Sequence, residues 1–260
     1  MSATRAQHSP DGLTSYGDGI ADVYDDWYSG PEKSTAETPA VDFLQAHAGD
    51  GPVLELGIGT GRVALPLAAR GVTVAGIEAS GRMVARLQEK PGGREIPVAT
   101  GDFADVAAPG GPFEMVFVVF NTFFMLTEQE TQVRCFRNVA AALRPGGAFV
   151  VEAFVPDVTL FDHGQRVQVD DLTGHTARIS LTRHDPITQR VHVRHLTFGP
   201  AGQQSYPLTM RYAWSAELDL MGRLAGLELA ERWGGWSRQP LTAASGLHVS
   251  VWRKPAVPGG

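Results

Sequence analysis

The chain has 260 residues, of which 43% are hydrophobic and 19% charged, so extensive disorder is excluded and a sizeable core is possible. The formal net charge of −6 excludes the broad positive surface that nucleic-acid binding requires. A single cysteine, Cys135, excludes a disulfide framework and a thiolate zinc site, and no apolar run is long enough to span a membrane. We therefore expect a cytoplasmic protein with a small-molecule partner, and no contact with nucleic acid or membrane.

The first 50 residues are predicted to form a helical lid. Apolar residues recur at helical spacing over 18–29, and a second helix is expected over 36–47. Residues 1–12 show no periodicity and are expected to be frayed.

Between residues 51 and 157, short apolar strands alternate with helices. Strands are expected over 52–56, 72–77, 96–100, 115–120 and 148–154. Helices are expected over 63–70 and 81–90, and a third is predicted to begin at the capping box Thr127-Glu-Gln-Glu130. Strands that are apolar along their whole length indicate a parallel sheet covered on both faces.

The pattern changes after Pro156. Polar and apolar residues alternate over four segments separated by turn sequences, 166–170, 176–183, 188–196 and 205–213. A helix capped by Ser215 and two last strands, 228–233 and 247–252, then return to the first sheet. We predict an α/β fold with a doubly wound, mostly parallel seven-stranded sheet (51–157 and 214–255) and an antiparallel β insert (158–213).

The most specific motif is the glycine loop Val53-Leu-Glu-Leu-Gly57-Ile-Gly59-Thr-Gly61-Arg62. Glycine at alternate positions lets the backbone bend tightly and approach a ligand closely. A dinucleotide-binding loop would carry its third glycine at position 62, so Arg62 argues against an NAD-dependent oxidoreductase. Glu78, at the end of the second strand, is placed to accept hydrogen bonds from both hydroxyls of a ribose.

With these features the chain resembles the class I S-adenosylmethionine (SAM)-dependent methyltransferases, over residues 18–155 and 214–253. The resemblance implies a Rossmann-like fold in which Gly57, Gly59 and Gly61 cradle the methionine and ribose of SAM, while Glu78 binds the ribose. Further residues matched to the cofactor site are Glu55, which opens the glycine motif, Asp102, for the adenine amino group, and Phe103, beside the adenine ring. From its charge and its place after the loop, Arg62 is assigned to the SAM carboxylate.

The acceptor is expected at the carboxyl ends of the strands, where Phe120-Asn-Thr-Phe-Phe124 follows the fourth strand. Asn121 stands where magnesium-dependent relatives use an acidic ligand, so we expect no metal and assign Asn121 to the cofactor site. Tyr16, Tyr24 and Phe124 are predicted to meet around the transferred methyl group. Either tyrosine or a water chain remains a candidate for taking the proton.

The histidines of the insert suggest zinc but lack tight ligand spacing. We predict that they are polar residues on the sheet surface: His163, His175, His184, His192 and His195.

The N-terminal helix, the segment Phe120–Phe124 and the insert together resemble bacterial antibiotic-tailoring N-methyltransferases of the lincosamide or aminosugar type. The resemblance implies methyl transfer to an amine of a small natural-product intermediate, with S-adenosylhomocysteine as the second product. It also implies a homo-oligomer formed through the insert. Two alternatives remain at this point, a small-molecule O-methyltransferase and a SAM-binding module without catalytic activity.

Overall fold

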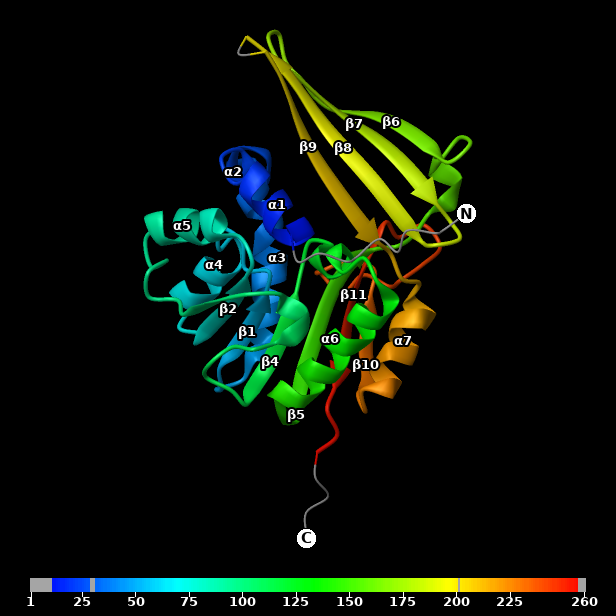
Figure 1. Cartoon of the computed structure of the whole chain (residues 1–260). Helices are drawn as coiled ribbons and strands as arrows, with labels where there is room; N and C mark the ends of the chain where they lie inside the picture. The colour runs from blue at the N-terminus through cyan, green and yellow to red at the C-terminus, as the bar shows by residue number, and fades with distance from the viewer. Residues whose placement is uncertain (1–10, 29–30, 201, 257–260) are drawn as a thin grey trace.

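The computed structural model describes residues 11–28, 31–200 and 202–256 and contains two β-sheets (Figure 1). The helices are α1 (Asp11–Ile20), α2 (Tyr24–Tyr28), α3 (Pro31–Ala48), α4 (Ala64–Ala69), α5 (Gly81–Glu89), α6 (Gln129–Ala142) and α7 (Ser215–Leu224). The strands of the main sheet are β1 (Val53–Leu56), β2 (Val74–Glu78), β3 (Val98–Thr100), β4 (Phe113–Val118), β5 (Leu143–Phe154), β10 (Glu228–Trp233) and β11 (Leu247–Arg253). The second sheet contains β6 (Gln165–Leu172), β7 (Ala177–Asp185), β8 (Arg190–Gly199) and β9 (Gly202–Arg211).

The main sheet has the strand order β10-β11-β5-β4-β1-β2-β3. Strands β1 to β5 pair in parallel, whereas β11 runs antiparallel to both of its neighbours, β5 and β10. This topology confirms the predicted doubly wound seven-stranded sheet.

Alternate residues of each central strand pack against different layers. In β4, Val116 and Val118 join the hydrophobic cluster that includes α6 and α7, whereas Met115 and Phe117 join the cluster that includes α3 and α4. Both faces of the sheet are therefore buried, which explains why its strands are apolar throughout.

The N-terminal segment differs from the expected pair of helices. α1 ends at Ile20, a turn follows over 21–23, and α2 begins at Tyr24, so the single helix predicted over 18–29 is wrong. The second half of α3 buries Phe43 and Leu44 in the core below the sheet. Residues of α1 and α2 instead lie at the strand ends.

Two predicted helix caps are also wrong. The N-cap residue of α6 is Glu128 and that of α7 is Trp214, and neither side chain makes a capping hydrogen bond. Glu128 instead forms an ion pair with Arg190 at the start of β8. The Glu128 side chain thus ties the insert to the core.

The insert is an antiparallel sheet of order β6-β7-β8-β9 that extends from one end of the main sheet (Figure 1). The buried side chain of Arg211, at the end of β9, donates hydrogen bonds to Gln132 of α6 at 2.6 Å and to Glu217 of α7 at 2.7 Å. These charge-assisted bonds fix the base of the insert on the core. In the described ranges, no helix has the length and hydropathy needed to cross a membrane.

Candidate active site

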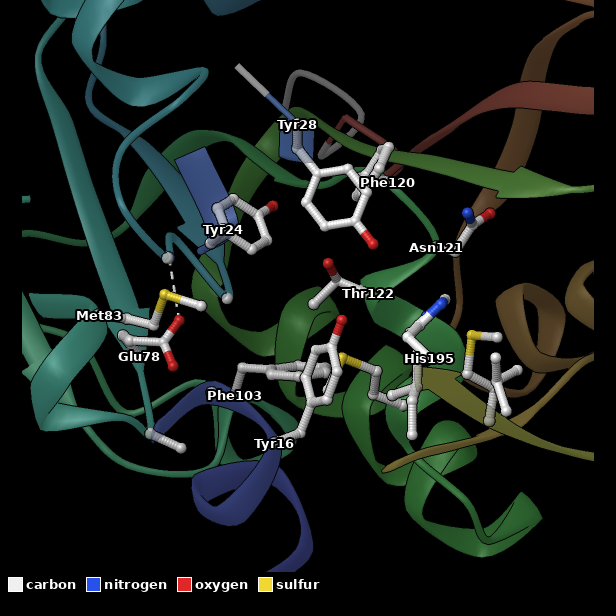
Figure 2. A pocket seen from close by; sticks show the side chains of 18 residues that line it. Tyr16, Tyr24, Tyr28, Glu78, Met83, Phe103, Phe120, Asn121, Thr122 and His195 are labelled. Carbon is white, nitrogen blue, oxygen red and sulfur yellow. Dashed lines mark hydrogen bonds between the residues drawn. The ribbon is translucent and has the colours of Figure 1, made fainter. Parts of the chain in front are cut away.

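A cavity of about 250 Å³ opens at the carboxyl ends of β1, β2 and β4, beneath α1 and α2 and against the insert (Figure 2). The glycine loop and Glu78 line one side of the cavity, and the segment 120–122 lines another. Val193 and His195 of β8, with Leu208 and Met210 of β9, close it from the insert. The cavity is therefore built from three parts of the chain that are far apart in sequence.

The glycine loop has the backbone geometry that a closely approached ligand requires. Gly57, Gly59 and Gly61 have φ values of +69°, +57° and +79°, where side chains are disfavoured. A Cβ on Gly57 would lie 2.6 Å from Cγ2 of Thr122, so the loop has no room for one. Gly57 and Gly59 line the cavity with bare backbone.

Glu78 holds this loop in place. Its Oε2 accepts a hydrogen bond from the Gly59 amide and its Oε1 one from the Ser80 amide, both at 2.9 Å. Burial raises the pKa of Glu78, and the backbone hydrogen bonds oppose that shift. The carboxylate thus faces the cavity and also supports the loop, a second role that the sequence did not indicate.

Phe103, Ala79 and Met83 also line the cavity, and Figure 2 shows Met83 next to Glu78. Asp102 precedes Phe103, and its Oδ1 accepts a hydrogen bond from the Ala104 amide at 2.8 Å. Asp102 does not line the cavity in the structure. Its predicted contact with adenine stays a prediction, and so does that of Phe103, which does line the cavity.

Two ionisable side chains, Glu55 and Arg62, lie next to the residues that line the cavity. Glu55 is 3% exposed, and its Oε2 has no hydrogen-bond partner among the described residues. Burial raises the pKa of Glu55 to about 8, and the charge of Arg62 opposes the shift. Arg62 also makes a side-chain hydrogen bond with Tyr24, and its guanidinium lies 4.6 Å from the ring centroid of Phe120. Glu55 and Arg62 therefore do not line the cavity, although Arg62 contacts Tyr24 and Phe120, which do.

The turn after β4 is strained. Phe120 and Asn121 both have left-handed backbone conformations, with φ of +57° and +63°. The Phe120 amide donates to the carboxylate of Glu152 at 2.8 Å, and Asn121 Oδ1 accepts from the Phe154 amide at 2.7 Å. These two bonds hold the turn, and they leave the Phe120 ring 37% exposed at the cavity.

The predicted position of Phe124 is wrong. Its side chain is fully buried and packs on Phe154 with ring centroids 4.9 Å apart, away from the cavity. The left-handed turn at 120–121 directs Phe120 toward the cavity and sends Phe124 into the core. Phe120, which meets Tyr28 at 4.9 Å, is the aromatic residue that the structure places there.

Three tyrosines from α1 and α2 line the cavity (Figure 2). Burial raises the pKa of Tyr24 to about 12, against the opposing effect of Arg62. Burial also raises the pKa of Tyr16 well above its usual value, and of Tyr28, which makes a side-chain hydrogen bond with Tyr16. Near neutral pH all three phenols keep their protons, so they act as hydrogen-bond donors. Tyr28 was not among the predicted site residues, although its position four residues after Tyr24 places both on one helix face.

The expectation that the insert histidines are surface residues is wrong for two of them. His184 is 8% exposed and hydrogen-bonds to the Tyr212 hydroxyl at 2.9 Å. His195 lines the cavity beside Trp27, with ring centroids 5.8 Å apart. Among the described residues, no group of three or more His, Cys, Asp or Glu side chains is arranged to hold a metal ion.

A second cavity of about 720 Å³ adjoins the first and shares Val193 and Met210 with it. Its walls are the mostly apolar segment 154–161 and the side chains of Thr182, His184 and Val191 on the insert. The two cavities therefore lie side by side along one face of the insert.

Comparison with known proteins agrees with this arrangement. A family model described as a methyltransferase domain matches residues 53–147. The cypemycin N-terminal methyltransferase of a Streptomyces species is 31% identical over 74% of this chain and 79% of its own length. The solved structure of the CcbJ methyltransferase from Streptomyces caelestis is 39% identical, with a TM-score of 0.87, and covers 94% of this chain and 99% of its own. DesVI from Streptomyces venezuelae is 25% identical, with a TM-score of 0.67 over 91% of this chain and 98% of its own.

The fold, the glycine loop and these similarities define a SAM-dependent methyltransferase. The chain belongs to the class I SAM-dependent methyltransferase family, and SAM is its methyl donor.

Proposed function

We propose that this enzyme transfers the methyl group of SAM to an amine nitrogen of a small natural-product intermediate. The observation that carries the proposal is the single cavity that has the glycine loop on one side and the tyrosines and His195 on the other. A donor and an acceptor held in this cavity would lie in contact, which is the main requirement for a displacement reaction.

The residues around the cavity fit SAM. Gly57 and Gly59 would hold its methionine part, Glu78 its ribose, and Phe103 with Met83 its adenine ring. The roles of Gly61, Asp102 and Glu55 remain proposals carried by the family resemblance, and those of Arg62 and Asn121 remain proposals from their positions in the sequence. When bound, SAM supplies a methyl group on a positively charged sulfur, which is a good leaving group.

The side chains opposite the loop suit an amine. The rings of Phe120 and Tyr28 form an apolar wall that disfavours the ammonium form of the acceptor, so its nitrogen lone pair is available for attack. The protonated phenols of Tyr16 and Tyr24 can donate hydrogen bonds to polar groups of the acceptor. The second cavity would take the rest of the acceptor, whose chemistry should be largely apolar to match the segment 154–161.

The relative named for N-terminal methylation of cypemycin supports nitrogen as the acceptor atom. A lincosamide intermediate is our specific hypothesis for the substrate, and it rests on the sequence resemblance alone. A small-molecule O-methyltransferase is the second candidate, because the structure brings His195, a residue able to deprotonate a hydroxyl, to the cavity.

We also propose a homo-oligomer through the insert. Val167 and Val169 of β6 are 70% and 59% exposed on the face of the insert that points away from the cavity. A monomeric mass by light scattering at micromolar concentration would contradict this part of the proposal.

The main test uses the whole chain with SAM carrying a deuterated methyl group and a panel of secondary amines, primary amines and phenols. We expect mass spectrometry to detect label on amines, with EDTA leaving the rate unchanged. Label on phenols alone would favour the O-methyltransferase. SAM binding without transfer to any acceptor, including lincosamide intermediates, would favour a module without catalytic activity.

A further inference from the structure

We propose that His195 is the residue that removes the proton from the acceptor nitrogen, and that Ser180 and Asp170 are positioning residues that set its tautomer. The inference rests on the proposed function, since it assigns a role at the same site. It adds a catalytic residue on the insert, outside the SAM-binding core.

The hydrogen bonds around His195 fix where its proton lies. Ser180 Oγ lies within hydrogen-bond distance of Asp170 Oδ2 and 2.8 Å from His195 Nδ1. A carboxylate only accepts, so the Ser180 hydroxyl donates to Asp170. Its oxygen is then the acceptor for an N–H at Nδ1 of His195, which leaves the Nε2 of the neutral ring without a proton.

The sheet places this ring at the cavity. His195 pairs with Ser180 on β7 and with Tyr206 on β9, and side chains opposite each other in antiparallel strands share a face. Val193 of β8 and Leu208 of β9 share that face and line the cavity with His195. Because Nδ1 is held by Ser180, Nε2 is the ring nitrogen left for a ligand, and Figure 2 shows the His195 ring among the side chains that line the cavity.

The surroundings keep His195 neutral at rest and able to gain a proton. Burial lowers the pKa of His195, and Asp170, 3.6 Å from Nδ1, opposes the shift. Arg178 of β7 also lowers it, and on the remaining side the ring meets the uncharged indole of Trp27. The neutral imidazole carries a free electron pair at Nε2 that can accept a proton, and Asp170 then stabilises the imidazolium. Tyr16 and Tyr24 are poor acceptors by comparison, because both phenols stay protonated.

The proposed step is a proton transfer. The N–H bond of a bound ammonium breaks and its electron pair becomes the nitrogen lone pair. A new N–H bond forms at Nε2 of His195, so the positive charge moves from the acceptor to the imidazolium. Water takes this proton after the reaction and restores the neutral ring.

The first test compares His195→Gln with His192→Gln. His192 lies on the same strand but on the opposite face, exposed and bonded to Thr209, so it is a matched control. With a cyclic secondary amine as the probe, we expect His195→Gln to lower kcat by ~10²-fold at pH 7. The loss should shrink above the amine's own pKa, where solution has already removed the proton, and His192→Gln should behave as wild type.

A loss in His195→Gln that stays constant from pH 6 to 10 would indicate a packing role and overturn the proposal. Wild-type kcat in His195→Gln would overturn it too. Asp170→Asn and Ser180→Ala should shift the pH profile of kcat while SAM affinity by calorimetry is unchanged. Profiles identical to wild type in both variants would contradict their positioning role.

The second test needs no turnover. In protein labelled with ¹⁵N-histidine, the His195 signals, identified by their loss in His195→Gln, should show a protonated Nδ1 and a bare Nε2 at pH 7.5. In Ser180→Ala this preference should weaken. A bare Nδ1 in the wild type would refute the tautomer argument even if amine methylation is confirmed. Absence of any methyl transfer to amines, with the expected tautomer present, would instead count against the proposed function.

Discussion

Glu78 offers the most direct test of how the structure links the cofactor site to the stability of the fold. Its carboxylate accepts hydrogen bonds from the amides of Gly59 and Ser80 and also faces the cavity. Glu78→Ala should therefore lower both SAM affinity and thermal stability. A carboxylate that only bound the ribose would affect affinity alone.

The magnitude follows from the two hydrogen bonds. A hydrogen bond to a charged group contributes about 1.5–3 kcal/mol, and water reaching the cavity in the variant makes the lower value appropriate. The variant also no longer buries a charged carboxylate, a cost that shows in the raised pKa of Glu78, and this offsets part of the loss. We expect a net loss of about 2 kcal/mol, or roughly 4–8 °C in Tm for a chain of this size. Loss of two bonds to the ribose should raise the Kd for SAM by ~10²-fold or more.

Thermal denaturation followed by circular dichroism measures the first effect and isothermal titration calorimetry the second. Glu78→Gln keeps one oxygen acceptor and should lie between wild type and Glu78→Ala in both measurements. Glu89→Ala, which removes an exposed carboxylate on the following helix, is the matched control and should change neither. If Glu78→Ala has wild-type Tm and wild-type SAM affinity, the assignment of Glu78 to loop and cofactor is refuted.

Three further predictions concern residues around the cavity. Because the pKa of Glu55 is raised to about 8 in the fold, the free energy of unfolding should fall by up to about 5 kcal/mol as pH rises from about 4.5 to 8. Glu55→Gln should remove this fall. If chemical denaturation gives parallel curves of stability against pH for the variant and the wild type, the raised pKa is contradicted. Phe124→Ala should lower the free energy of unfolding by ~3–5 kcal/mol, whereas Phe120→Ala should lower turnover with little loss of stability. The reverse pattern in denaturation and kinetic assays would mean that Phe124, as the sequence predicts, lies at the methyl-transfer site. Tyr24→Phe keeps the ring and should change kcat by less than ~10-fold; a ~10²-fold loss would assign proton transfer to its hydroxyl.

The parts of the fold that sequence analysis predicted are those specified by local patterns. Apolar strands, glycine at positions 57, 59 and 61, and alternation after Pro156 each depend on a few consecutive residues, and the two sheets follow from them. The predicted helix caps were wrong, and at α6 the residues around the expected cap contact the insert: the Thr127 carbonyl accepts a hydrogen bond from Arg190. Glu128 also binds Arg190, which lies 62 residues away.

The acceptor side of the site was harder to predict because it depends on geometry between distant segments. The segment Phe120–Phe124 has three aromatic residues, and composition alone does not say which of them faces a ligand. That choice is made by the left-handed conformations at 120 and 121, which are held by Glu152 and by the Phe154 amide. His195 was missed for a related reason, since its partners Ser180 and Asp170 lie 15 and 25 residues earlier and meet it only across strand pairs.

The register of the insert therefore matters for chemistry as well as for packing. Side chains alternate between the two faces of a strand, so a slip of one residue in β8 would turn His195 outward and bring His192 or Arg194 to the inner face. Several contacts act against such a slip. Trp27 of α2 packs on Tyr206 and His195, Arg178 lies over the Trp27 ring, and Arg211 ties the end of β9 to α6 and α7. The proposed donor site is thus built from short local motifs of the core, whereas the position of the proposed proton acceptor, His195, depends on how the lid and the core hold the insert.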